Sequence, residues 1–150
     1  MTLRYVVDVS ILAEYIVAKS PYRERVTKLL HRCERGEIEL YLPSINLSEL
    51  IYVTARIYAW AGSDNPNEET MNYVSYLRGI GVRVLSPDER AVIKAGELKK
   101  ELRLSLADCY ILATAERLGA VPLFKRVEDE MKQIESKLRK QGLKVLDELE

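Results

Sequence analysis

Short apolar runs alternate along this chain with longer segments of helical periodicity, and this alternation restricts the fold more than any other feature. The runs lie at residues 3–9, 38–42, 82–85, 120–124 and 143–146. Strands that alternate with helices form parallel sheets, and the adjacent Val6 and Val7 indicate a strand that is buried on both faces. The sequence therefore predicts an α/β fold, with three α/β/α layers around a central parallel sheet of four to five strands.

The expected helices begin and end at residues that are typical of helix termini. We expect Ser10 to cap the first helix, and Ser86 to cap a helix that has Pro87 in its first position and ends near Leu102. Further helices are expected at residues 21–35, 44–61, 66–78, 105–118 and 128–140. No repeat and no Pro/Gly-rich linker divides the chain, so we expect one domain over residues 1–150.

Composition excludes several classes of protein. With two cysteines and one histidine, the chain lacks the ligands of a Cys/His zinc site, and Cys33 and Cys109 are interpreted as buried apolar residues. No apolar run approaches the ~20 residues that span a bilayer, and the N-terminus lacks a signal-peptide layout, so we expect a cytoplasmic protein. The 23 basic and 23 acidic residues balance, which removes the simplest argument for nucleic-acid binding, a basic composition, but is compatible with a local basic rim around an acidic pocket.

Asp8 and Glu49 interrupt apolar segments. Asp8 directly follows the first strand, at the carboxyl end where parallel sheets bind ligands. A helix-start acid that interacts with the helix dipole is the alternative explanation for it. Glu49 lies four residues after Ile45 and four before Val53, on a helix face that is otherwise apolar. Both positions therefore indicate a carboxylate that has a function beyond solvation.

Asp108 has a structural explanation of its own. Ser105 and Asp108 match a capping box, in which the acid bonds back to the capping residue. However, Asp108 is in register with Leu112 and Ala115 on the inward face of its helix. Converging carboxylates repel one another unless cations lie between them. Hard oxygen ligands suit Mg²⁺ or Mn²⁺, and phosphodiester hydrolysis uses that arrangement.

Three segments of the chain resemble the acidic motifs of PIN domains. Tyr5-Val-Val-Asp8-Val-Ser10 resembles the opening strand of that family, and Pro43-Ser-Ile-Asn-Leu-Ser-Glu49-Leu resembles its second motif. Leu106-Ala-Asp108-Cys-Tyr-Ile-Leu-Ala-Thr-Ala resembles the third. The segments occur in the family's order, and the resemblance covers essentially the whole chain.

The resemblance implies an endoribonuclease that depends on Mg²⁺ or Mn²⁺. By that similarity Asp8 and Asp108 are catalytic metal ligands, Glu49 completes the acidic metal pocket, and Ser10 supports it by hydrogen bonding. Many small members are VapC-type toxins that form homodimers and are blocked by a cognate antitoxin. RNA, an antitoxin protein and a second copy of the chain are therefore the expected partners.

The fourth motif departs from the family pattern. PIN domains usually follow the fourth strand with Thr-x-Asp, whereas here Lys125 stands in place of Thr and the Asp position falls near Arg126 or Val127. Glu128 is our choice for the fourth catalytic acid and Asp129 the substitute, although both also suit a plain helix N-terminus. Lys125 and Arg126 are candidate contacts for RNA phosphates, with solvated charges as the alternative.

Two other functions stay open on the sequence alone. A phospho-acceptor signalling domain also gathers acids at strand ends, but of its expected Thr and Lys only Lys125 fits. A PIN-like module that binds RNA or protein without cleaving RNA is favoured by the altered fourth motif.

Overall fold

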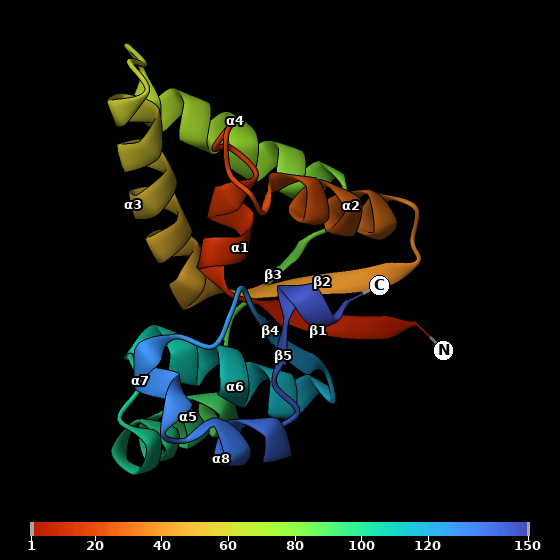
Figure 1. Ribbon diagram of the computed structural model, residues 1–150, viewed down its shortest axis with the longest axis vertical. Coiled ribbons are helices and arrows are strands. Elements are labelled where there is room, and N and C mark those ends of the chain that lie inside the picture. The colour runs from red at the N-terminus through yellow and green to blue at the C-terminus, as the bar shows by residue number, and fades with distance from the viewer. Residues whose placement is uncertain (1, 150) are drawn as a thin grey trace.

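A five-stranded parallel sheet forms the centre of the computed structural model, which describes residues 2–149 (Figure 1). The strands are β1 (Leu3–Val7), β2 (Ile38–Pro43), β3 (Arg83–Leu85), β4 (Val121–Phe124) and β5 (Lys144–Val145). Their order across the sheet is β3-β2-β1-β4-β5, and every neighbouring pair is parallel. This confirms the predicted α/β architecture.

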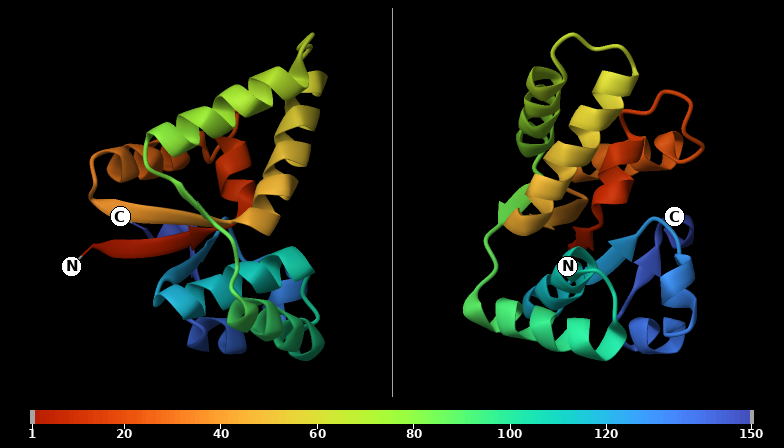
Figure 2. Two further views of the ribbon diagram at one scale, coloured as in Figure 1. Left: turned by 180° about the vertical axis from the view of Figure 1, so that it is seen from behind. Right: turned by 90° about the vertical axis from the view of Figure 1, so that its left-hand side faces the viewer.

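Helices cover both faces of the sheet, as the views in Figure 1 and Figure 2 show. One face carries α1 (Val9–Glu14), α2 (Arg23–Glu34), α3 (Ser44–Trp60) and α4 (Pro66–Gly79). The other carries α5 (Glu89–Leu102), α6 (Leu106–Leu118), α7 (Asp129–Lys132) and α8 (Glu135–Lys140). A 3₁₀ turn follows β5 at Leu146–Glu148. None of the helices within residues 2–149 combines the length and the hydropathy of a membrane-spanning segment.

Two apolar cores lie on opposite sides of the sheet. Val7 belongs to the core beneath α1–α4, whereas the adjacent Val6 belongs to the core beneath α5–α8, and both are fully buried. Successive side chains of a strand point to opposite faces, so both faces of β1 are covered. The sequence prediction of a doubly buried first strand is therefore confirmed.

Two helix starts differ from the prediction, because aspartates take the capping positions that we assigned to serines. Asp8 is the N-cap of α1, so Ser10 lies inside the first turn and the strand ends at Val7 instead of Val9. Asp88 caps α5 by accepting a 2.8 Å hydrogen bond from the Ala91 backbone N–H. Aspartate caps helices as well as serine does, so capping preference alone does not choose between neighbouring candidates.

Two further predicted boundaries are wrong. The segment expected as one helix at 128–140 is broken into α7 and α8, and Met131 and Leu138 are both buried in the same core. Tertiary packing thus outweighs the hydrogen bonds that a continuous helix would gain.

Helix α2 starts at Arg23 instead of residue 21. A turn closes just before it, in which the Arg23 N–H donates to the Ser20 carbonyl at 3.2 Å.

Candidate active site

Asp8 lies at the carboxyl end of the central strand. Its backbone N–H donates to the Leu123 carbonyl on β4 at 2.9 Å, which extends the β1–β4 pairing by one residue. The Ser10 hydroxyl donates to its carboxylate, with 2.5 Å between Ser10 Oγ and Asp8 Oδ2. Burial raises the pKa of Asp8, although the Ser10 hydroxyl and the positive charge of Lys125 both act to lower it.

Glu49 on α3 and Asp108 on α6 lie close enough to Asp8 for its charge to act on both carboxylates. Burial raises the pKa of Glu49, and the negative charge of Asp8 raises it further. Burial and the charge of Asp8 raise the pKa of Asp108 to about 7, with Glu49 adding to that effect. The structure thus brings the three predicted acids within electrostatic reach of one another.

The capping interaction predicted for Asp108 is also present in part. The Ser105 hydroxyl oxygen accepts from the Asp108 backbone N–H at 3.1 Å, as the first half of a capping box requires. The same serine side chain lowers the pKa of Asp108, but burial and the neighbouring acids prevail. Asp108 therefore sits at a helix start and still belongs to the acidic cluster.

Asn46, which the sequence analysis did not single out, ties α3 to α6. Its side chain is fully buried in the first turn of α3, and its amide donates to the Ala107 carbonyl at 3.1 Å. This bond joins the helices that carry Glu49 and Asp108. The Asn46 Oδ1 atom is buried and has no hydrogen-bond partner among the described residues. The one available signal was a polar residue in the first turn of a helix beside a predicted site.

The acid of α7 that acts on Asp108 is not one that we predicted. Glu128 is the N-cap of α7 and pairs with Arg126, with 3.1 Å between Arg126 Nε and Glu128 Oε1. Asp129 is almost fully exposed and pairs with Lys132. Instead, the charge of Glu130 contributes to the raised pKa of Asp108. No sequence pattern pointed to Glu130, because the orientation of its side chain depends on where α7 begins and ends.

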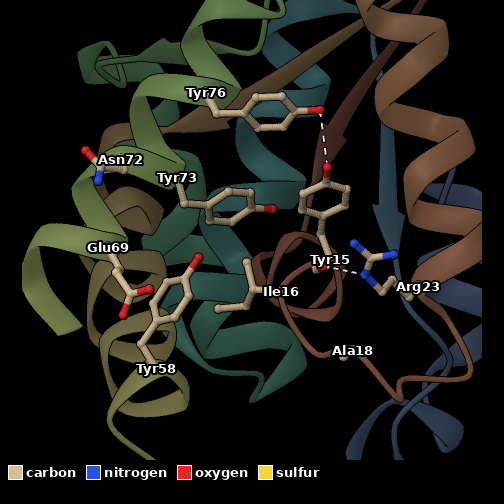
Figure 3. Close-up of a pocket in the computed structure, with 9 residues that line it drawn as sticks. All are labelled: Tyr15, Ile16, Ala18, Arg23, Tyr58, Glu69, Asn72, Tyr73 and Tyr76. Atoms are coloured by element: carbon tan, nitrogen blue, oxygen red, sulfur yellow. Dashed lines mark hydrogen bonds between the residues drawn. The ribbon is translucent and has the colours of Figure 1, made fainter. Parts of the chain in front are cut away.

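An aromatic pocket of about 450 Å³ opens between the end of α1 and the α3–α4 pair (Figure 3). The ring of Tyr15 stacks on those of Tyr73 and Tyr76, with 5.7 Å between ring centroids in both cases. The Arg23 guanidinium lies over the Tyr15 ring at 5.2 Å. The remaining lining residues are Ile16, Ala18, Tyr58, Glu69 and Asn72. Such a surface suits recognition, and the three clustered acids are not part of it.

The acidic cluster has the donor chemistry of a hard-cation site. Asp8, Glu49 and Asp108 offer carboxylate oxygens, the ligands that Mg²⁺ and Mn²⁺ prefer. Among residues 2–149, no group of three His, Cys, Asp or Glu side chains is arranged so that it could hold a metal ion by itself. Mg²⁺ usually keeps several waters and uses one or two carboxylates. The residues present therefore fit a partly hydrated ion.

A PIN domain family model matches residues 5–137. The chain belongs to the PIN domain family. Members of this family are generally nucleases and typically use divalent metals, and in this PIN domain the three acids lie at the carboxyl end of the sheet. No curated protein sequence matches the chain.

Solved structures share the fold, and two of them are similar over nearly the whole chain. A toxin–antitoxin complex from Klebsiella pneumoniae contains a chain that is 18% identical, with a TM-score of 0.65 over 97% of this chain and 99% of that one. A crystal structure of a protein from Pyrobaculum aerophilum is 16% identical, with a TM-score of 0.59 over 94% of this chain and 98% of that one. At these identities the likeness concerns the arrangement of the backbone.

Proposed function

We propose that this PIN domain is an endoribonuclease that depends on Mg²⁺ or Mn²⁺. The observation that carries the proposal is the acidic cluster itself. Asp8, Glu49 and Asp108 come from three different elements, and the charge of Asp8 raises the pKa of both other acids. Holding three carboxylates close to one another is unfavourable without a cation. A bound divalent ion would offset this repulsion, which would explain why the three acids are placed near one another.

Each residue of the cluster has a distinct task in this proposal. Asp8, Glu49 and Asp108 would hold the ion, directly or through its bound waters, and the ion would activate a water and stabilise the leaving oxygen of the phosphodiester. The Ser10 hydroxyl fixes the Asp8 carboxylate by its 2.5 Å hydrogen bond. Asn46 keeps the helices of Glu49 and Asp108 at a constant separation. Glu128 remains our proposed fourth catalytic acid. In that role its carboxylate would first have to separate from Arg126, with which it pairs in the structure.

The direct test is cleavage of a single-stranded RNA by the purified protein. We expect cleavage with Mg²⁺ or Mn²⁺, complete loss in excess EDTA, and full recovery when Mn²⁺ is added back, because the proposed mechanism relies on the ion to activate water and to stabilise the leaving oxygen. Products are resolved on a denaturing gel. Cleavage that continues at the same rate in EDTA would contradict a metal-dependent mechanism.

A second candidate is a PIN-like module that binds RNA or protein without cleaving it. The observation that favours it is the fourth motif, where Lys125 replaces the usual Thr and Glu128 is paired with Arg126. Such a module would retain RNA affinity in a filter-binding assay while it released no product with either metal. The same RNA assayed for binding and for cleavage therefore separates the two functions.

We further propose that the protein is the VapC-type toxin of a toxin–antitoxin pair and acts in the cytoplasm, where its RNA substrate would be. The structural likeness to the chain of a toxin–antitoxin complex supports this. The prediction is that a small protein encoded next to this gene binds the chain and stops RNA cleavage at a 1:1 ratio. A neighbouring protein that binds without lowering the cleavage rate would argue against an antitoxin.

Homodimer formation is also proposed, supported by exposed apolar side chains beside the acidic cluster. Ile45 at the start of α3 and Leu106 at the start of α6 are 42% and 48% exposed. Their helices meet at the Asn46–Ala107 hydrogen bond. Tyr52 and Trp60 continue the exposed apolar surface along α3. A second copy of the chain would cover these side chains and border both acidic clusters.

A further inference from the structure

A mostly buried ion pair lies beside the acidic cluster. Lys125 directly follows β4, and its Nζ is 2.9 Å from the Glu14 Oε1 atom at the end of α1. The two side chains are only 16% and 19% exposed. The Ser20 hydroxyl donates to the other carboxylate oxygen of Glu14, and the Lys125 ammonium lies 5.2 Å from the centre of the Tyr22 ring. These contacts hold the ammonium in one place.

The elements that fix Lys125 also fix Asp8. Asp8 caps α1, the helix that ends with Glu14, and its backbone bonds to Leu123, two residues before Lys125. The positive charge of Lys125 accordingly lowers the pKa of Asp8. Burying an ion pair commonly costs as much free energy as the pair gains. The ion pair is therefore not expected to add much to the stability of the fold. Its proximity to Asp8 points instead to a role at the site.

The residues that follow β4 carry the opposite charge to the one that the PIN pattern leads one to expect. The pattern has a neutral Thr followed by an acid, whereas this chain has two basic residues. Lys125 stands in place of the usual Thr, and the next residue, Arg126, pairs with Glu128. A second metal ion at this corner would therefore meet a fixed ammonium instead of a free carboxylate. Like charges disfavour each other, and the charge of Lys125 already reaches the Asp8 carboxylate.

We propose that Lys125 is a built-in cation of the acidic cluster, which supplies positive charge next to Asp8 and limits the site to one divalent ion. The inference rests on the proposed metal-dependent function. Glu14 is then a positioning residue, because it acts by holding the Lys125 ammonium in place. Lys125 permanently supplies a positive charge that a second bound ion would otherwise supply.

The test measures Mn²⁺ binding to the full chain by isothermal titration calorimetry, without RNA. We expect the wild-type protein to bind one Mn²⁺. Lys125→Met should bind Mn²⁺ ~10-fold more tightly or gain a second ion, because it removes the repelling charge. Lys125→Arg keeps the charge and should stay within about twofold of the wild type. Lys132→Met, which removes an exposed lysine from α7, is the matched control and should also match the wild type.

Two results would overturn the proposal: two Mn²⁺ ions bound by the wild-type protein, or unchanged affinity and stoichiometry in a folded Lys125→Met variant. Circular dichroism shows whether Lys125→Met folds. If it does not, the number of Mn²⁺ ions bound by the wild-type protein and the Mn²⁺ affinity of Lys125→Arg still test the proposal. Failure here is distinguishable from failure of the proposed function. RNA cleavage with two bound ions would reject only the role of Lys125, whereas one bound ion without cleavage would reject only the nuclease.

Discussion

Asp8→Asn should lower the rate of RNA cleavage by ~10³-fold or more, because a metal ion contributes several kcal/mol of transition-state stabilisation and each 1.4 kcal/mol is a factor of ten. The substitution keeps the shape of the side chain and removes one negative charge. That charge acts on both other acids, since Asp8 raises the pKa of Glu49 and of Asp108.

Glu39→Gln is the matched control for this variant. Glu39 is also a partly exposed carboxylate on the sheet, but it lies near the amino end of β2 and pairs with Arg4. It should keep wild-type cleavage. Initial rates with Mn²⁺ at saturating RNA, together with circular dichroism of both variants, separate lost chemistry from lost folding. Wild-type cleavage by Asp8→Asn would show that the acidic cluster is not the active site.

The sequence predicted the parallel sheet and the three acids of the cluster for a shared physical reason. Val6 and Val7 together required cover on both faces of a strand, and the structure provides two cores for them. Each acid stands at a strand end or on an apolar helix face, where a charge is costly without a partner. Because carboxyl ends of parallel strands share one edge of a sheet, these costly positions were expected to converge.

What the sequence did not predict depends on contacts between distant residues. Glu14 and Lys125 are 111 residues apart, and they meet because β1 and β4 are neighbours in the sheet. Strand order is not encoded in the apolar runs themselves. The bond from Asn46 to α6 likewise depends on how two helices pack. Glu130 could not be chosen over Glu128 without knowing that the expected helix is broken.

The second large effect concerns stability and pH: Asp108→Asn should make the metal-free protein more stable at pH 8. Burial and the charges of nearby acids raise the pKa of Asp108 from 3.8 to about 7 in the folded protein. At pH values between 3.8 and about 7, Asp108 is mostly protonated in the folded state and mostly ionised in the unfolded state. The free energy of unfolding therefore falls as pH rises from about 4 to 7, and the loss is complete at pH 8.

Asparagine carries no charge at either pH, so Asp108→Asn should flatten this pH dependence and exceed the wild type at pH 8 by up to about 4 kcal/mol, because each pKa unit corresponds to about 1.4 kcal/mol. Urea unfolding in EDTA at pH 5 and pH 8 measures both effects. Mn²⁺ at pH 8 should stabilise the wild type but hardly the variant, because a cation that binds only the folded state shifts unfolding by mass action. A variant that is less stable than the wild type in EDTA at pH 8 would mean that Asp108 contributes to folding through its capping role. Repulsion within the cluster predicts instead that the variant is more stable than the wild type. The substitution removes the repelling charge, while the Ser105 oxygen still accepts from the residue 108 backbone N–H.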